Sequence, residues 1–240
     1  MALGHVEADL HESIHLFQSI KPVVLVGGGY CTGADLALAG RYSQCFVAAD
    51  GGANTLLANA ITPAAVIGDM DSIEPAVRTL MPATKMHFVA EQESTDFEKC
   101  LHHIVAPTIL GLGFTGQRID HQMAALHALV RYPQQRCVLL AEHDVIFLAP
   151  PELMVDLPCD TRIPLFPMGS VSGHSAGLAW PVDGLDFAPE RQIGTSNKTK
   201  GSVKLAFSAP LMLVILPRDF LSSALQALRQ AQRQWPVSGG

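Results

Sequence analysis

Acidic side chains recur through the first half of this chain, at points where an apolar stretch stops. Asp69 and Asp71 are one residue apart after such a stretch, so both carboxylates can converge on one cation. Asp50 follows an earlier stretch and Asp96 a later one. Carboxylate oxygens are the ligands that Mg²⁺ prefers, usually together with substrate phosphates. The pattern predicts metal-assisted phosphate chemistry; the alternative for Asp69 and Asp71 is a plain turn followed by a helix cap at Ser72.

The segment around Asp96 has the features of a helix start, because hydroxyl groups at 94–95 can cap the first turn and an acid there suits the helix dipole. The same helix end could present Asp96 to a metal and, one turn later, Lys99 to a phosphate oxygen. The alternative for Lys99 is a solvated partner of Glu98 or Glu93, a pairing that would contribute little to stability.

A further helix is predicted to begin with Arg118, Asp120 and His121 at the same edge of the sheet. Arg118 could hold a phosphate, and Asp120 could orient a ligand or simply cap the helix. A single histidine at a helix start is more often a surface residue than a catalytic base, so His121 stays ambiguous.

A glycine-rich segment, 27–33, follows the first aliphatic run and precedes a helical pattern. Backbone N–H groups in this context can cradle an anion. The spacing departs from G-x-G-x-x-G and there is no Gly-Lys-Ser/Thr ending. A tight turn therefore explains the segment about as well as a phosphate loop does, and a nicotinamide enzyme is disfavoured.

In the second half of the chain, Trp180 and the segment 194–197 are candidates for binding a flat heterocycle. Trp180 could stack on the ring, and Ser196 and Asn197 could hydrogen-bond to it. The alternatives are a core tryptophan and an ordinary polar turn, and the pattern alone favours these alternatives.

The elements that must position these residues are predicted from apolar periodicity. Six short aliphatic runs read as buried strands: 23–26, 45–49, 64–67, 86–89, 108–112 and 137–141. Two helical faces lie between them, one formed by Phe97, Leu101, Ile104 and Val105, the other by Ile119, Met123, Leu126 and Val130. Strands alternating with helices predict an α/β domain with a mostly parallel, Rossmann-like sheet.

The composition of the sequence changes after Pro150. Prolines and glycines become frequent there, and the runs of alternating apolar and polar residues are short. This pattern indicates an all-β sandwich or barrel. We place the boundary there, giving an α/β domain over 1–150 and an all-β domain over 151–240. Leucines at helical spacing from Asp219 onward predict a closing helix.

Composition limits the class of protein. The net charge is −6, and residues 1–150 hold eight Lys and Arg against fifteen Asp and Glu, which argues against a nucleic-acid surface. Five scattered cysteines without C-x-x-C spacing are typical of reduced thiols. Residues 1–21 lack the pattern of a secretion signal, and the longest aliphatic run, 211–216, is far shorter than a membrane span. We expect a cytoplasmic protein that does not span a membrane.

Five blocks of sequence, taken in order, resemble the thiamine pyrophosphokinase family. They are Asp50-Gly51-Gly52-Ala53-Asn54, Gly68-Asp69-Met70-Asp71-Ser72-Ile73, Ser94-Thr95-Asp96-Phe97-Glu98-Lys99-Cys100, Arg118-Ile119-Asp120-His121 and Gly194-Thr195-Ser196-Asn197. The resemblance implies an α/β nucleotide-binding domain, a C-terminal β-sandwich, and a homodimer whose active site lies between subunits. It also implies transfer of the pyrophosphoryl group of ATP to thiamine, giving thiamine diphosphate and AMP.

The resemblance implies roles for individual residues. The magnesium ligands would be Asp69, Asp71 and Asp96, with Asp50 lining the same pocket and Lys99 touching the transferred phosphates. The implied catalytic group is Asp71, Asp96, Lys99 and Asp120. Nucleotide contacts are expected from Asp50, Gly51, Gly52, Asn54, Arg118 and His121. Thiamine contacts are expected from Thr195, Ser196 and Asn197. Trp180 is added as the candidate stacking aromatic from its residue type alone, not from the resemblance. Met70 and Ile119 stand where the family more often has phenylalanine, and both are expected to be packing positions.

Other functions share part of this pattern. Another magnesium-dependent kinase or nucleotidyl transferase would have the same acids and a different acceptor. A non-catalytic sensor would bind nucleotide or thiamine diphosphate without releasing AMP. The number of carboxylates beside Lys99 argues against a sensor, because a pure binder has little use for so many unpaired acids at one edge.

Overall fold

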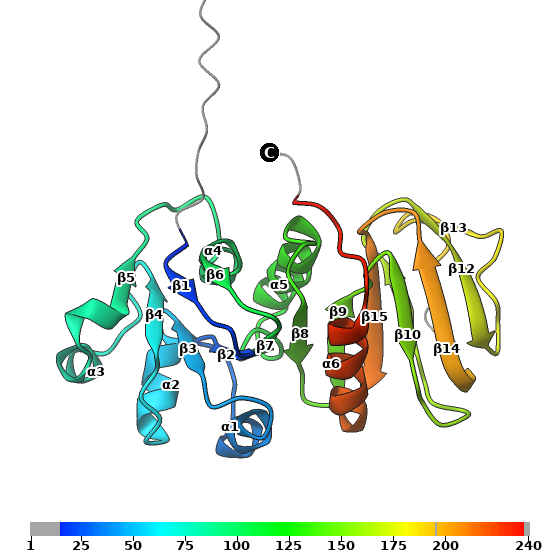
Figure 1. The fold of residues 1–240 in the computed structure, drawn as a ribbon. Helices are drawn as coiled ribbons and strands as arrows, with labels where there is room; N and C mark the ends of the chain where they lie inside the picture. Colours follow the sequence, from blue (N-terminus) through cyan, green and yellow to red (C-terminus); the bar gives the residue numbers. More distant parts are fainter. Residues whose placement is uncertain (1–14, 195, 238–240) are drawn as a thin grey trace, which may run out of the picture.

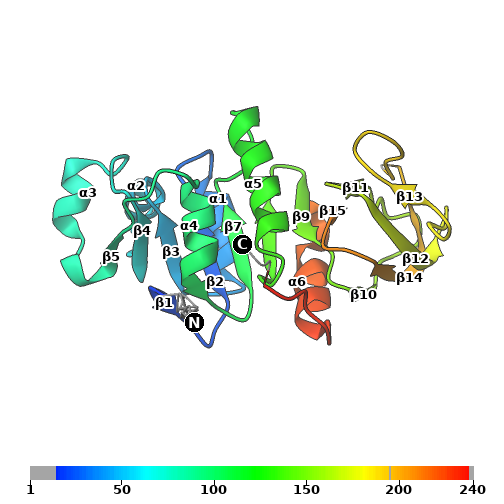
Figure 2. The same cartoon turned by 90° about the horizontal axis from the view of Figure 1, so that it is seen from above.

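The computed structural model describes residues 15–194 and 196–237. Its strands form a nine-stranded mixed sheet, a four-stranded antiparallel sheet and a small two-stranded piece. The molecule is elongated, with the two larger sheets arranged along its length (Figures 1 and 2). Within the described ranges, no helix has the length and apolar character needed to cross a lipid bilayer.

Six strands of the large sheet run parallel, in the order β8-β7-β2-β3-β4-β5. Their bounds are β2 (Val23–Val26), β3 (Phe46–Ala49), β4 (Ala65–Gly68), β5 (Met86–Phe88), β7 (Ile109–Leu112) and β8 (Cys137–Leu140). All but β5 are buried along their whole length, as expected for parallel strands covered on both faces. The six predicted aliphatic runs are confirmed as these strands.

Within residues 15–194 and 196–237, six α-helices cover the sheet: α1 (Gly33–Gly40), α2 (Gly52–Ala58), α3 (Pro75–Leu80), α4 (Asp96–His103), α5 (Ile119–Arg131) and α6 (Leu221–Gln230). Short 3₁₀ turns, η1 (Ala83–Lys85) and η2 (Arg218–Phe220), precede β5 and α6. Helices α1, α2, α3 and α6 share one apolar core, and α4 and α5 share the other. The closing helix predicted after Asp219 is confirmed as α6.

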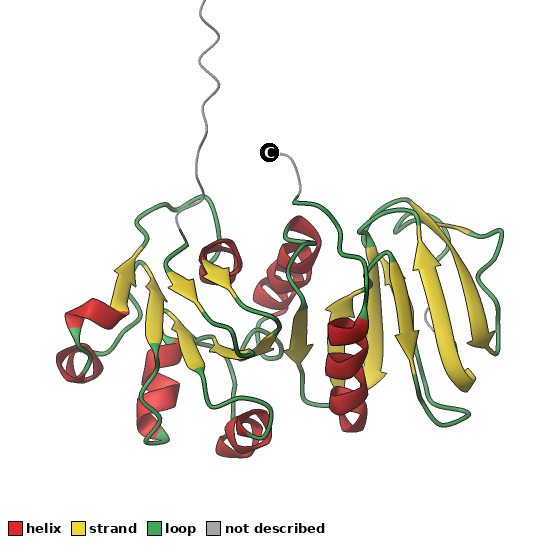
Figure 3. Ribbon diagram, in the orientation of Figure 1, coloured by secondary structure: helices red, strands yellow, loops and turns green. Residues whose placement is uncertain are grey.

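The second half of the chain is antiparallel. The large sheet continues through β9 (Asp144–Leu148), β15 (Met212–Pro217) and β11 (Leu165–Pro167). The four-stranded sheet contains β10 (Glu152–Val155), β12 (Val171–Leu178), β13 (Asp186–Phe187) and β14 (Thr199–Phe207). Inward side chains of both layers belong to one core, and beyond α6 this end of the molecule consists of strands and loops (Figure 3). Strands from beyond Pro150 thus join both sheets, and a domain boundary at that residue stays a prediction.

Both predicted helical faces need correction. Ile104 and Val105 do not extend α4; they form β6 (Ile104–Val105), which pairs with β1 (Phe17–Gln18). Helix α5 is present, but Ile119 is 76% exposed and Met123 64% exposed. The buried residues of α5 lie in its second half, because only that half packs on the sheet.

Candidate active site

Three carboxylates meet where β3 and β4 end. Asp50 and Asp69 directly follow these two neighbouring parallel strands, and Asp71 lies in the turn after β4. One oxygen from each of the three lies within 4.8 Å of the others. The backbones approach closely here, since a Cβ on Gly68 would lie 2.8 Å from the Cβ of Asp50. We call Asp50, Asp69 and Asp71 the acid cluster.

Asp50 is the buried member of the acid cluster, with 1% of its surface exposed. Its Oδ2 accepts a hydrogen bond from the backbone N–H of Ser72 at 3.2 Å, whereas its buried Oδ1 has no hydrogen-bond partner in the part of the chain that the structure describes. Burial, together with the charge of nearby Asp96, raises the pKa of the Asp50 carboxyl. An unpartnered buried carboxylate oxygen is costly, so this atom is suited to meet a cation.

Asp69 has more partners. Its Oδ2 accepts from the side-chain amide of Gln92 at 3.0 Å, and its Oδ1 from the backbone N–H of Asp71 at 3.3 Å. Desolvation acts to raise the pKa of Asp69, but these hydrogen bonds and the charge of Lys99 hold it below its usual value. Gln92 was not among the predicted site residues, because an uncharged side chain in a loop gives no signal in the sequence.

Asp71 is the exposed member of the acid cluster. Its Oδ1 accepts a hydrogen bond from the Ser72 hydroxyl at 2.8 Å. Exposure to solvent therefore increases from buried Asp50 to exposed Asp71, so a ligand arriving from solvent would meet Asp71 first.

Helix α4 brings Asp96 and Lys99 to the acid cluster. The Lys99 Nζ lies 3.2 Å from Asp96 Oδ1 and 3.6 Å from Asp69 Oδ2. Lys99 is only 3% exposed, so the alternative of a solvated lysine is wrong. Burial would lower the pKa of Lys99, but the adjacent acids, Asp96 foremost, raise it. Burial also raises the pKa of Asp96, against the effect of Lys99. Lys99 thus holds a buried positive charge between two acids.

The predicted nucleotide contacts beside Asp50 support the turn that carries the acids. The Asn54 side chain donates to the Ser72 carbonyl at 2.9 Å and accepts from the Glu74 N–H at 3.0 Å. Gly51 and Gly52 begin α2 where it touches β2, and a Cβ on Gly52 would lie 1.9 Å from the Val26 carbonyl oxygen. These residues keep the 70–74 turn in place.

The glycines at 27–29 follow β2 and pack backbone against backbone. The Gly29 N–H donates to the Gly113 carbonyl at 3.1 Å, and a Cβ on Gly29 would lie 2.5 Å from that oxygen. Close packing of the turn accounts for glycine at this position.

Arg118 and Asp120 form an exposed, bidentate pair at the start of α5. The Arg118 guanidinium donates to the two Asp120 carboxylate oxygens at 2.7 and 3.2 Å. The hydrogen bond from Arg118 lowers the pKa of Asp120 to about 2. His121 and Ile119 are exposed beside them, so the expected packing role of Ile119 is wrong, whereas Met70 is buried as expected.

Trp180 and Asn197 lie between the end of β12 and the start of β14, and Gly194 pairs with β11; these strands are at the opposite end of the molecule from β4 and β5 (Figures 1 and 2). Trp180 is 59% exposed and is therefore not a core residue. Asn197 is buried, and its amide accepts from the Trp180 N–H at 3.2 Å and donates to the Trp180 carbonyl at 2.7 Å. Ser196 is exposed, and Thr195 lies outside the described residues. Asn197 thus braces the backbone that presents the indole.

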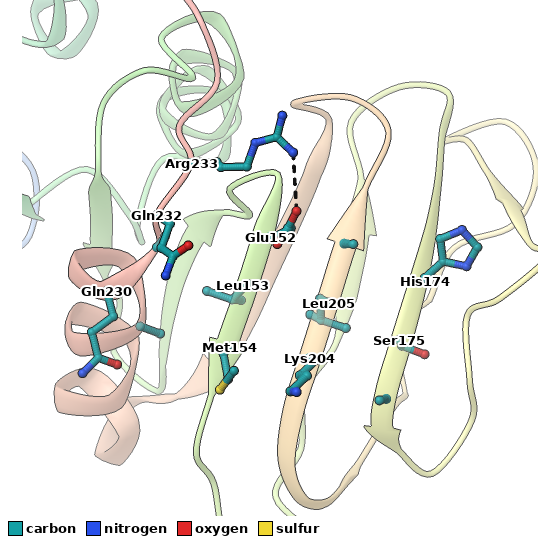
Figure 4. A pocket seen from close by; sticks show the side chains of 14 residues that line it. Glu152, Leu153, Met154, His174, Ser175, Lys204, Leu205, Gln230, Gln232 and Arg233 are labelled. Atoms are coloured by element: carbon teal, nitrogen blue, oxygen red, sulfur yellow. Dashed lines mark hydrogen bonds and ion pairs between the residues drawn. The ribbon is translucent and has the colours of Figure 1, made fainter.

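A groove of about 500 Å³ lies elsewhere, between the end of α6 and the outer face of the four-stranded sheet. Figure 4 shows Met154, His174 and Lys204 along it, with Arg233 and Glu152 at one side, 3.5 Å apart. No member of the acid cluster lines this groove. Its size would suit a small molecule, but the converging buried charges lie at the acid cluster.

Comparisons with known proteins agree with this geometry. The family model described as "Thiamin pyrophosphokinase, catalytic domain" matches residues 39–140, which include the acid cluster, Asp96 and Lys99. Thiamine pyrophosphokinase 1 of Oryza sativa subsp. japonica is 33% identical over 154 residues, covering 56% of this chain and 58% of the rice protein. Thiamine pyrophosphokinase 2 of Arabidopsis thaliana is 28% identical over 197 residues, covering 68% of this chain and 74% of the plant protein. The match thus spans less than two thirds of the rice protein's length.

Solved structures share the fold. Thiamin pyrophosphokinase from Geobacillus thermodenitrificans superposes with a TM-score of 0.68 at 23% identity, covering 82% of this chain and 97% of that one. Yeast thiamin pyrophosphokinase gives a TM-score of 0.69 at 18% identity, covering 90% and 92%. The mixed sheet followed by an antiparallel sheet is therefore a known arrangement. This chain is thus similar to thiamin pyrophosphokinases in fold, and over residues 39–140 it matches the model of their catalytic domain.

Proposed function

We propose that this protein transfers the pyrophosphoryl group of ATP to the hydroxyl group of thiamine, giving thiamine diphosphate and AMP. The observation that carries the proposal is the acid cluster with buried Lys99 beside it, inside the segment that matches the family's catalytic domain. Residues 1–150 would then form a Rossmann-like nucleotide-binding unit, and residues 151–240 the unit that meets thiamine. Ligands of parallel sheets bind at the carboxyl ends of the strands, which is where the acids lie.

The donor set fits a hard divalent cation, for which we propose Mg²⁺. Asp50, Asp69 and Asp71 supply carboxylate oxygens within 4.8 Å of one another, and Asp50 Oδ1 has no other partner. Asp96 is the further predicted ligand, and in this structure it is paired with Lys99. When bound, the cation would neutralise charge on the ATP phosphates.

The reaction needs alignment and charge compensation more than a strong base. The thiamine hydroxyl oxygen attacks the β-phosphorus, the bond from that phosphorus to the oxygen bridging the α-phosphorus breaks, and AMP leaves. Lys99 would donate to oxygens of the transferred group, and Arg118 would hold a phosphate of ATP. We propose that the hydroxyl proton passes to the Asp120 carboxylate, which its pair with Arg118 keeps ionised. Asp120 would also hold Arg118 in place.

A second copy of the chain would complete the thiamine-binding site. Trp180 and Asn197 follow β12 and precede β14, at the far end of the molecule from the acid cluster, so one chain does not bring the two sites together (Figure 1). We propose a homodimer in which Trp180 of one copy stacks on the thiamine held at the acid cluster of the other. Ser196 and Thr195 would contribute polar contacts there, whereas the Asn197 amide already binds the Trp180 backbone.

Product analysis tests the proposed reaction. Purified protein would be incubated with ATP and Mg²⁺, with and without thiamine, and the products identified by mass. We expect AMP and thiamine diphosphate in equal amounts, and no AMP without thiamine. ADP with thiamine monophosphate would contradict attack at the β-phosphorus, and folded protein that binds ATP without turnover would contradict the enzyme proposal.

A further inference from the structure

Glu98 is a buried carboxylate that the proposed chemistry does not use. It lies on α4 between Asp96 and Lys99 in the sequence, with its side chain 7% exposed. Asp96 and Lys99 face the acid cluster, whereas the Glu98 side chain contacts the start of α4 and helix α5. A buried acid needs compensating partners, and these contacts provide them in part.

One oxygen of Glu98 closes the first turn of α4. Its Oε2 accepts from the Thr95 N–H at 3.1 Å and from the Thr95 hydroxyl at 3.2 Å. In return, the Thr95 hydroxyl oxygen accepts from the Glu98 N–H at 3.3 Å. This reciprocal capping box fixes the backbone from which Asp96 begins the helix.

The other oxygen of Glu98 faces α5. Its Oε1 is buried and has no hydrogen-bond partner among the described residues, and it lies 3.8 Å from both His127 Nδ1 and Arg131 Nη1. Arg131 and His127 are more than half exposed, whereas losing them would leave the buried Glu98 oxygen uncompensated, so the contact resists separation of the two helices. Glu98 therefore ties the start of α4 to the side of α5.

The same turn of α4 supplies the charged groups of the site. The Lys99 N–H donates to the Thr95 carbonyl at 2.9 Å, and the Lys99 ammonium bridges Asp96 and Asp69. Any rotation or fraying of this turn would move both side chains relative to the acid cluster. We propose that Glu98, held between Thr95 and the facing side chains of α5, is a positioning residue that keeps Asp96 and Lys99 aligned with the acid cluster. The inference rests on the proposed function of that cluster.

Helix α1 offers a matched control within the same chain. There Asp35 forms the same capping box with Thr32, accepting from its N–H at 2.8 Å and its hydroxyl at 2.7 Å, and its other oxygen accepts from Arg218. Asp35 thus combines a helix cap with an ion pair to another element, as Glu98 does. It makes no contact with the acid cluster among the described residues.

The test compares Glu98→Gln with Asp35→Asn in the full chain. Each substitution keeps the shape of the side chain and removes its charge. Three quantities would be measured: the melting temperature, the affinity for Mn²⁺ without substrates, and amide hydrogen exchange in the peptide 94–103. We expect both variants to lose thermal stability. Only Glu98→Gln should bind Mn²⁺ more weakly, by about 10-fold, and exchange faster in 94–103. With substrates present, its kcat should fall more than its KM for thiamine rises.

A second variant keeps the cap and removes the two α5 side chains that face Glu98. His127→Gln with Arg131→Met should weaken Mn²⁺ binding in the same direction, and by less when Glu98 is already Gln. Unchanged Mn²⁺ affinity and unchanged exchange in folded Glu98→Gln, or equal losses of Mn²⁺ affinity in Asp35→Asn, would overturn the positioning role. Wild-type protein that fails to make thiamine diphosphate would count against the proposed function, whereas the exchange difference between the two variants would still decide the role of Glu98.

Discussion

The acid cluster and the Trp180 end of the molecule differ in the kind of ligand that their side chains could bind. At the acid cluster, charges are gathered and partly buried, and Asp50 Oδ1 is left without a partner. At the other end, the indole of Trp180 is exposed and Asn197 holds its backbone. The first arrangement suits a cation and phosphates; the second suits a flat ring. Among the described residues, the acid cluster and the exposed Trp180 indole lie at different ends of the molecule. We therefore propose that two copies bring them together.

Asp71→Asn should give the largest effect, because it removes a charge from the exposed member of the acid cluster without changing its shape. We expect kcat to fall by at least about 100-fold and Mn²⁺ binding to weaken, with the melting temperature nearly unchanged. Steady-state kinetics and metal titration would measure this. Asp219→Asn, an exposed acid in η2, is the control and should behave as wild type. Near-normal turnover in folded Asp71→Asn would remove the metal assignment.

Lys99→Met should come next. The buried ammonium between Asp69 and Asp96 would be lost, leaving those acids to repel each other. We expect kcat to fall by roughly 10- to 100-fold, with a smaller change in KM for thiamine. Lys85→Met removes a partly exposed lysine from the same half of the chain and serves as the control. A rise in KM for thiamine with unchanged kcat would contradict a role for Lys99 at the transferred phosphates.

Trp180→Ala should affect binding more than chemistry. Loss of stacking is expected to raise KM for thiamine by about 10-fold while kcat stays within a few fold. Trp235→Phe is the contrasting variant, because the Trp235 indole donates to the Ala149 carbonyl at 2.8 Å inside the fold. It should lower the melting temperature and leave KM unchanged. If Trp180→Ala left KM for thiamine unaltered, the proposed use of this end would be wrong.

The sequence predicted the structure best where one short segment determines a strand or the start of a helix. Aliphatic runs covered on both faces predicted the six parallel strands, and the order of those strands explains why Asp50 and Asp69 meet. The start of α4 at Asp96 was likewise predicted from its cap. These features depend on local periodicity and on a general property of parallel sheets.

Features that depend on packing between distant segments were not predicted. Gln92 reaches Asp69, and Glu98 meets His127 and Arg131, only because the loop and the helices fold against each other. Helical spacing also placed Ile119 in the core, whereas the first half of α5 extends away from it. Periodicity identifies the apolar face of a helix, but not how much of its length another layer covers.

Mixing of subunits tests the central comparison most directly. Asp71→Asn and Trp180→Ala proteins would be purified separately, dissociated and reassociated together, and assayed at thiamine well below its KM. A mixed dimer has one site with intact Asp71 from one copy and intact Trp180 from the other, so we predict that activity rises above that of either variant alone. Activity equal to the average of the two separate variants, in dimers shown to have exchanged, would contradict a site shared between copies.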